Sequence, residues 1–211
     1  KKEIMETITM ITTIAVALIT AVFGPIAVAW ARTKFEKKSD KTPMAEALEV
    51  SKLINDQLEN LMSELKCDRV WVAQFHNGGN FYPTGKSIQK FSICYELVTI
   101  ETPRIQQTFQ NIPVSLFPKV LSKIYKDGEL EILNAESEEM SFGIDALTNQ
   151  FKTKSICMVG LRSLDNHLIG VMGISYTKEH NVINSEWDYI RNKSGVIGTL
   201  LSKYLYKTNK K

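Results

Sequence analysis

The chain has 211 residues, which suits one domain with an appendage and argues against two large domains. Its 26 basic and 23 acidic residues nearly balance, for a net charge of +3, so we expect no nucleic-acid partner. The three cysteines are widely spaced and form no Cys-x-x-Cys pair, which argues against a disulfide framework and a zinc site.

An uncharged apolar segment, "ITMITTIAVALITAVFGPIAVAW", runs from Ile8 to Trp30. At about 1.5 Å per residue, a helix of this length spans a hydrocarbon core of about 30 Å. We therefore predict a transmembrane anchor over residues 1–31 that contacts membrane lipid through residues 8–30. A cleaved signal peptide is the alternative, but Glu3 and Glu6 are unusual in the basic region of such a peptide.

The charges that flank this segment predict its orientation. Lys1 and Lys2 precede it, whereas a larger group of basic residues follows it: Arg32, Lys34, Lys37 and Lys38. The positive-inside rule then predicts a single-pass inner (plasma) membrane protein with a cytoplasmic C-terminal domain.

Residues 32–66 read as a polar linker followed by a connector helix from Met44 to Lys66, which contains no glycine or proline. Apolar residues recur along this helix every three or four positions: Ala47, Val50, Ile54, Leu58, Leu61 and Leu65. Such a stripe is typical of a short coiled coil that joins copies into a homo-oligomer, and equally of a helix that packs on the following domain. Both hold if the first half pairs with another chain and the second half covers the sheet.

From residue 67 to 206 the pattern changes to an α+β domain. Strands are expected at 69–76, 88–98 and 129–134, and a strand pair at 153–177 turns at Asp165-Asn166-His167. Helices are expected at 114–128, ended by Gly128, at 142–151, and at 186–205 after a cap at Asn184 or Ser185. This order predicts an antiparallel sheet with helices on its faces, followed by a basic tail at 207–211.

Several of these stretches resemble the GAF family, a relative of PAS-type sensor domains: the connector helix, "RVWVAQFHNGG", "KDGELEI" and "GLRSLDNHLIGVMGISYT" with the last helix. The resemblance covers roughly Leu48 to Tyr206. It implies a five- or six-stranded sheet, a small-molecule pocket between sheet and helices, and dimerisation through the terminal helices. The Asn-Lys-x-x-x-Phe-Asp-Glu signature of cyclic-nucleotide GAF domains is absent, and no cysteine stands in the usual context for a bilin. The cofactor is therefore left unknown.

A second resemblance is to the T-even phage holin family, which also combines one N-terminal span, a connector helix and a basic-tailed C-terminal domain. It is carried by "SLDNHLIGVMGISYTKEHNVINSEW" and "YKTNKK". It implies a protein that oligomerises in the inner membrane with a periplasmic C-terminal domain. The flanking charges disagree with that topology. The two functional hypotheses are thus a membrane-anchored GAF-like domain that senses or docks a ligand or partner, and a phage holin.

Polar side chains near the first strand pair are the candidate ligand-binding residues: His76, Tyr82, Lys90, Tyr95, Glu96 and Arg104. A filled core with these residues solvated at its rim is the alternative. His76 with Glu96 or Cys94 is the sole candidate catalytic pair, and without an elbow serine, a metal-ligand histidine pair or a phosphate loop we predict no enzyme. Cys94 and Cys157 lie in apolar runs and are expected to be inert core thiols.

The stretch "AQFHNGGNFYPTG", Ala73 to Gly85, joins the first two strands. We expect His76 to end the first strand and Asn77-Gly78-Gly79 to supply the turn, because glycine adopts positive φ without strain. A turn does not require the two aromatic residues of this loop, Phe81 and Tyr82. Together with Asn77 they form the candidate contact surface for a protein partner.

Overall fold

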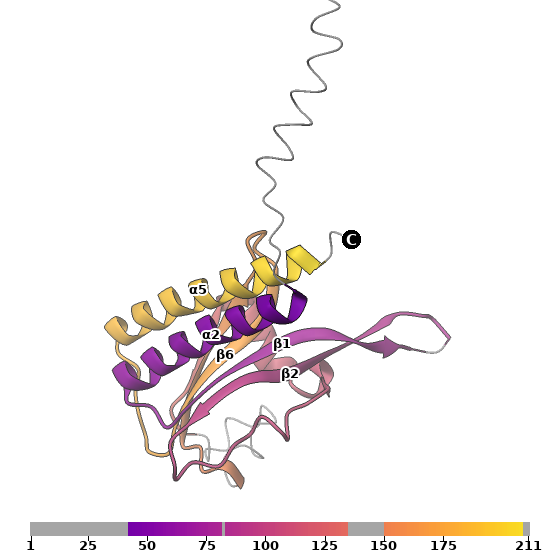
Figure 1. Ribbon diagram of the computed structural model, residues 1–211. Coiled ribbons are helices and arrows are strands. Elements are labelled where there is room, and N and C mark those ends of the chain that lie inside the picture. Colours follow the sequence, from indigo (N-terminus) through magenta and orange to yellow (C-terminus); the bar gives the residue numbers. More distant parts are fainter. Residues whose placement is uncertain (1–41, 82, 135–149, 209–211) are drawn as a thin grey trace, which may run out of the picture. The chain divides into compact units, whose positions relative to one another are not determined.

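The computed structural model describes residues 42–81, 83–134 and 150–208. From Pro43 onward they belong to one compact unit, in which a six-stranded antiparallel sheet carries helices on both faces (Figure 1). The α+β class is therefore confirmed. The predicted membrane span at residues 8–30 lies outside the described residues, and none of the described helices is long and apolar enough to cross a membrane.

The sheet has the strand order β3-β2-β1-β6-β5-β4, with β1 and β6 at its centre. The strands are β1 Arg69–Asn80, β2 Ser87–Val98, β3 Ile112–Pro113, β4 Glu129–Ile132, β5 Ser155–Arg162 and β6 Leu168–Tyr176. The turn between β5 and β6 has Asn166 at φ 63°, the conformation that asparagine tolerates best after glycine, as the sequence predicts. The two-residue edge strand β3 is too short to be recognised from its sequence.

Helices α2, Pro43–Leu65, and α5, Asn184–Thr208, lie together on one face of the sheet (Figure 1). Between them and the sheet lies the first apolar core, to which β1 contributes Val70 and Val72. The apolar stripe of α2 points into this core: Ile54, Leu58 and Leu61 are 0% exposed and Leu65 is 6% exposed.

These four residues therefore pack within their own domain, and a coiled-coil seam through them is wrong because no part of them is left for a second chain. Ala47 and Val50 are only half-buried. For this first part of the stripe, pairing with another chain stays a prediction.

The second apolar core lies on the opposite face, under α3, Pro118–Asp127. The helix expected at 114–128 is divided into a 3-10 turn, Val114–Leu116, and α3. The division falls at Phe117 because proline disfavours a helical backbone in the residue before it, and Pro118 then begins α3. Gly128 ends α3 at φ 86°, as expected. Except for its last two residues, the helix expected at 142–151 lies outside the described residues.

The first hairpin is longer than predicted. Strand β1 continues past His76 to Asn80, and the turn lies at 81–86, where the Phe81 N–H donates to the Lys86 carbonyl at 2.8 Å. The predicted turn at Asn77-Gly78-Gly79 is wrong, because Asn77 still pairs with Gln89 and the positive φ of Gly79, 100°, only produces an irregularity in the ladder.

Candidate functional site

A cavity of about 50 Å³ lies between the sheet and the layer formed by α3 and residues 99–111. Apart from the indole of Trp71, no side chain in its wall carries a nitrogen or oxygen atom. The wall consists of Trp71, Ala73, Phe75, Phe91, Ile93, Ile105, Phe109, Phe117, Val120, Leu121, Ile124, Met158 and Val171. A cavity of this kind suits a small apolar molecule, since apolar cavities stay dry.

The indole of Trp71 is placed by a glycine on the neighbouring strand. Trp71 pairs with Gly173 of β6, and a Cβ at Gly173 would lie 2.1 Å from Cζ2 of the indole. Glycine thus lets the ring lie against the sheet. Trp71 is 7% exposed, and its Nε1–H has no hydrogen-bond partner. Buried indole N–H groups normally have one, but this nitrogen is not exposed to the cavity, whose surface is apolar throughout.

Aromatic side chains form the side of the cavity away from the sheet centre. The ring centroids of Phe91 and Phe117 are 5.7 Å apart, and those of Phe109 and Phe117 are 6.4 Å apart. Phe151 extends the cluster, with its centroid 6.3 Å from that of Phe109. Edge contacts of this kind hold rings firmly, so the cavity wall is ordered by its own packing.

A buried carboxylate holds the segment that carries Ile105 and Phe109. Glu96 of β2 is 6% exposed, and its carboxylate accepts the backbone N–H of Ile105 at 2.8 Å and of Gln106 at 3.1 Å. In this role Glu96 is part of the cavity's support and does not line the cavity.

The same carboxylate faces Arg69, whose Nε lies 3.5 Å from Oε1. The Arg69 guanidinium also donates to three oxygens of two other segments: Thr153 Oγ1 at 2.8 Å, Pro103 O at 2.6 Å and Phe151 O at 2.9 Å. Burial lowers the pKa of Arg69, while the charges of Glu96 and Asp68 act in the opposite direction. Arg69 therefore ties residues 99–111 and 151–153 to the end of β1.

The predicted ligand-binding residues that the structure describes do not form one pocket, and none of these lines the cavity. Tyr95 and Glu96 are consecutive in β2, so their side chains lie on opposite faces. Tyr95 reaches Ser51 of α2, with 3.3 Å between hydroxyl oxygens. Arg104 is exposed and donates to the Glu96 carbonyl at 3.4 Å.

The side chain of Lys90 lies over Gly78, where a Cβ would come 2.3 Å from Lys90 Cδ. Tyr82 is outside the described residues. Ligand binding by single members of the predicted set stays a prediction.

The residues that do line the cavity were missed, although the sequence contains a signal for them. In β1, Val70 and Val72 face α2, while Trp71, Ala73 and Phe75 alternate with them and are apolar as well. A strand with two apolar faces indicates that other elements pack on both faces of the sheet. This pattern predicts a second apolar layer, and with it a pocket, on the face away from α2.

His76 lies beside a serine. Its Nε2 is 2.9 Å from Ser92 Oγ, and its Nδ1 is 3.3 Å from the Asn77 carbonyl. Ser92 Oγ also accepts the Asn111 N–H at 2.9 Å. The pair lies on the α2 face of the sheet, away from the cavity. Among the described residues, the hydrogen-bond partners of His76 are a carbonyl and a hydroxyl, and not a carboxylate.

The cysteines divide into two groups. Cys67 and Cys157 are buried, and burial raises the pKa of Cys67 to about 12 and that of Cys157 still further. Cys94 is exposed, so the expectation that it is a core thiol is wrong: it occupies the register shift opposite Val72 and Ala73. Among the described residues, no group of three or more His, Cys, Asp and Glu side chains could hold a metal ion.

The candidate partner-contact residues lie in the outer hairpin. Phe81 is 53% exposed, and Asn77 Oδ1 accepts the Gln89 side-chain amide at 3.0 Å. Tyr82 again lies outside the described residues. Nothing in the structure tests a partner at this surface.

Comparison with known proteins gives a match at the level of structure alone. No protein-family model matches the chain, and no curated protein matches it. The comparisons add no support to the holin resemblance.

Several solved GAF domains share the fold. The blue-light absorbing form of the PixJ GAF domain of Thermosynechococcus elongatus matches with a TM-score of 0.61 and 16% identity, over 78% of this chain and 92% of that one. The phycocyanobilin-bound GAF domain of a cyanobacterial phytochrome gives 0.60 and 15%, over 79% and 91%. A GAF domain/HD domain protein from Geobacter sulfurreducens gives 0.59 and 13%, over 79% and 99%. The chain therefore has a GAF-like fold.

Proposed function

We propose that this protein is a membrane-anchored, non-enzymatic GAF-like domain that senses a small apolar ligand in the cavity under α3. The observation that carries the proposal is the apolar surface of the cavity, to which Trp71 contributes ring carbons and not its Nε1–H. Such a site favours a molecule of a few heavy atoms without polar groups.

The large cofactors of some GAF domains fit this site poorly. A volume of about 50 Å³ is far below that of a cyclic nucleotide or a linear tetrapyrrole, and the cavity wall contains no cysteine for covalent attachment. Cys157 lies beside Met158 of the wall, but its side chain belongs to the core on the α2 face. The ligand is therefore of a different and smaller class.

Ligand-dependent thermal unfolding of the full-length chain tests the proposal. The probes are short aliphatic ketones and alcohols beside alkanes of equal size. We expect the alkanes to raise the midpoint more than the ketones, because no polar group of the cavity surface can meet a ketone oxygen. A ligand at 100 times its Kd stabilises the folded state by about 2.7 kcal/mol. Trp71→Phe keeps the cavity surface apolar, so it should leave the preference of alkane over ketone unchanged.

Ala73→Val is the control for the site itself. Two added methyl groups occupy the cavity, so this variant should lose the response to every probe while unfolding no earlier than the wild-type chain. If Ala73→Val and the wild-type chain respond equally, the ligands bind elsewhere and the proposal fails.

The anchor at residues 8–30 and its orientation have a separate test. A reporter that functions only in the cytoplasm, fused after Lys211, should be active. An inactive fusion with an active periplasmic reporter at the same site would reverse the proposed topology.

Oligomerisation is proposed to use the first turns of α2. Met44 and Leu48 there are 69% and 63% exposed, beside the half-buried Ala47 and Val50. Leu48→Glu should lower the mass of detergent-solubilised particles measured by light scattering. The exposed Leu53, on another side of α2, is the matched control, and Leu53→Glu should leave the mass unchanged.

The absence of catalysis is tested at Ser92, since its hydroxyl lies 2.9 Å from His76. A serine activated by histidine reacts with a fluorophosphonate. We expect no adduct at Ser92, because the group on His76 Nδ1 in the described part of the chain is a backbone carbonyl and not a carboxylate. An adduct that disappears in His76→Gln would overturn the non-enzymatic assignment.

A further inference from the structure

The outer part of the first hairpin, residues 76–90, is here called the hairpin arm. Strand β1 pairs with β6 only from Arg69 to Gln74, and β2 pairs with β3 only at Lys90 and Phe91. Beyond these points the two strands have no partner but each other, and Figure 1 shows the ribbon projecting from the sheet. A lone two-stranded ribbon is marginally stable in water, so an exposed arm of this length suggests a surface that binds it.

The arm points past the first turn of α2. Ser51 and Tyr95 are joined at 3.3 Å, and α2 and β2 run in the same direction (Figure 1). The eight residues back to Pro43 cover about 12 Å of helix, whereas the eight residues back to Ser87 cover about 26 Å of strand. The turn of the arm thus lies well beyond the point at which the chain enters the domain.

The end of α5 lies at this same end of the domain. Helices α2 and α5 are antiparallel (Figure 1), and the Lys193 ammonium donates to Gln57 Oε1 at 2.9 Å. Pro43 is fourteen residues before Gln57, and Thr208 is fifteen residues after Lys193. The start of α2 and the end of α5 therefore meet, and the arm projects past both.

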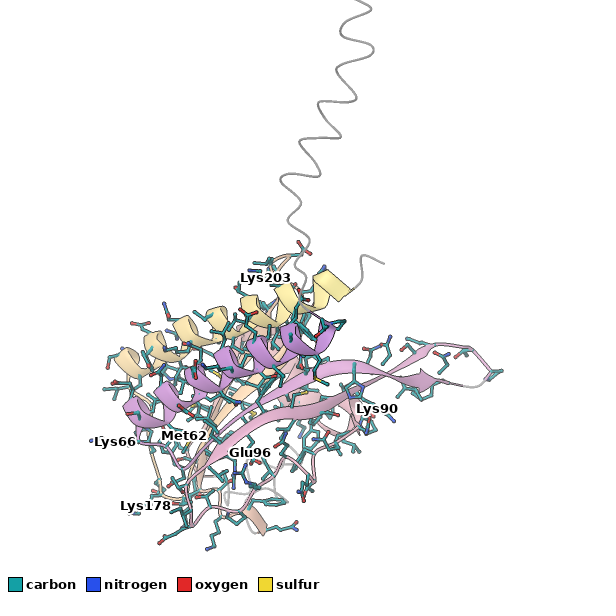
Figure 2. All side chains as sticks on the ribbon, in the orientation of Figure 1. Met62, Lys66, Lys90, Glu96, Lys178 and Lys203 are labelled. Atoms are coloured by element: carbon teal, nitrogen blue, oxygen red, sulfur yellow. The ribbon has the colours of Figure 1, made fainter. Side chains whose placement is uncertain are left out.

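The hairpin arm is basic, whereas this end of the domain carries charges of both signs. The turn between β5 and β6, which contains Asp165, lies there too, because the Leu164 N–H donates to Ser202 Oγ of α5 at 3.3 Å. From Arg69 to Tyr95 the sequence has no carboxylate, and none follows Asp188. Lys86 and Lys203 are exposed, and Lys90 is half-exposed; Figure 2 shows Lys90 at the base of the arm and Lys203 near the end of α5. Glu46 and Glu49, in the first turns of α2, are acidic residues at this same end of the domain.

The tip of the arm adds an apolar side chain. Phe81 is 53% exposed although its backbone is fixed, since its N–H donates to the Lys86 carbonyl and its carbonyl accepts the Gly85 N–H, each at 2.8 Å. A rigid turn that presents an aromatic ring beside lysines matches the composition of segments that lie at a membrane surface.

We propose that the hairpin arm contacts the anionic lipid surface of the membrane that anchors the chain, with Phe81 at the acyl boundary and Lys86 and Lys90 among the headgroups. The proposal rests on the proposed anchor. Only residues 31–42 separate the predicted span from Pro43, so the end of the domain that bears the arm is the end tethered to the bilayer. Anionic headgroups attract lysines near the surface, which supplies the charge complementarity.

Tryptophan quenching in the full-length chain tests this contact. Phe81→Trp is compared with Ile100→Trp, because Ile100 is likewise an exposed apolar residue but follows the opposite end of β2. Each chain is reconstituted into phosphatidylcholine vesicles with or without phosphatidylserine, with brominated acyl chains as the quencher. Subtracting the parent chain removes the contribution of the three native tryptophans.

We expect the added tryptophan of Phe81→Trp to be quenched in phosphatidylserine vesicles at least about twofold more than in phosphatidylcholine, and that of Ile100→Trp in neither. Adding Lys86→Gln should lower the ratio of chains whose arm contacts the lipid to chains whose arm does not by about fivefold. This is the effect of one lysine at an anionic surface.

Phe81→Trp emission that is unquenched in both lipids, in a chain that floats with the vesicles, overturns the arm contact and leaves the anchor standing. A chain that does not float overturns both. Emission that follows the protein-to-lipid ratio instead of the lipid charge identifies a second copy of the chain as the occupant, and overturns the lipid contact. Ligand binding in the cavity is measured independently by the series of alkanes and ketones.

Discussion

Arg69 and Glu96, on the paired strands β1 and β2, form an ion pair in which the side chains are 1% and 0% exposed. The pair holds the cavity-lining segment in place, because Glu96 binds the backbone of Ile105 and Gln106 while Arg69 binds the carbonyl of Pro103. The charged groups most buried in this domain thus act on the cavity through its wall. Ligand affinity and fold stability are coupled at this point.

Breaking this pair from either side should destabilise the domain strongly. We expect Glu96→Gln or Arg69→Met to lower the free energy of unfolding by about 3–5 kcal/mol, because each leaves a buried charge without its counter-ion. Urea unfolding monitored by tryptophan fluorescence measures the change.

The double variant Arg69→Met/Glu96→Leu separates the pair from its surroundings. Its loss in free energy of unfolding should be smaller than the sum of the losses in the two single variants, since it leaves no lone buried charge. The control is the exposed pair of Arg191 with Glu129, joined at 2.8 Å, where Glu129→Gln should have a much smaller effect. Equal effects at the two pairs would contradict the structural role given to Glu96.

Thiol labelling should distinguish the three cysteines. Cys94 is exposed, whereas Cys67 and Cys157 are buried. We expect a maleimide at about pH 7.5 to modify one thiol in the folded chain and three in denaturant. The reaction of Cys94 should be slower than that of a free thiol, because desolvation raises its pKa. Mass spectrometry counts the adducts, and Cys94→Ser should leave the folded chain unmodified. Labelling of Cys67 before unfolding would contradict its burial.

Cys67 should also make the fold less stable in alkali. Burial raises its pKa from an ordinary value of 9.0 to about 12, so between these values the unfolded chain loses this proton while the folded chain keeps it. The unfolded state then binds fewer protons, and stability falls as pH rises above 9. We expect a loss of about 1 kcal/mol by pH 10 from this residue.

The measurement compares urea midpoints at about pH 8 and about pH 10, one unit either side of the ordinary value of 9.0, for the wild-type chain and Cys67→Ala. The variant should be less stable at both values because it loses packing, but its midpoint should fall less between them. The midpoint of Cys67→Ala should still fall between the two pH values, because burial also raises the pKa values of Cys157 and Tyr176. Identical falls in the two chains would show that Cys67 does not titrate differently on folding.

The sequence was sufficient for the sheet and for most of its helices, because local signals agree there with tertiary packing. Gly128 ends α3 and Asn166 turns the last hairpin, each with a positive φ that its side chain tolerates. The first hairpin was misread because Asn77-Gly78-Gly79 looks like a turn in isolation. Cross-strand pairing with residues 87–90, which only the folded chain reveals, keeps this segment in β1.

The candidate site was harder to predict, because sequence reasoning looked for polar side chains. Glu96 and His76 attracted attention by their chemistry, yet Glu96 binds backbone amides and His76 binds a serine on the other face. The cavity is a packing defect among apolar residues from four strands, α3 and a loop. Its existence depends on how those side chains fit together, which residue types alone do not encode.

Two glycines of α5 provide a paired test of the helix and its contact with the sheet. A Cβ at Gly195 would meet nothing within 4 Å, whereas one at Gly198 would lie 2.5 Å from the carbonyl oxygen of Arg162 in β5. Both substitutions add the same methyl group to the same helix, three residues apart. The intrinsic preference for alanine is thus common to both, and the difference between them reports the contact with β5.

Gly195→Ala should raise the free energy of unfolding by about 0.5–1 kcal/mol, the usual gain when alanine replaces glycine inside a helix. Gly198→Ala should lower it by about 1–3 kcal/mol, because a backbone oxygen cannot move aside as a flexible side chain can and α5 must shift away from β5. Urea unfolding of both variants in parallel measures the two signs. If Gly198→Ala also proved stabilising, α5 would not pack against β5 as closely as the 2.5 Å approach requires.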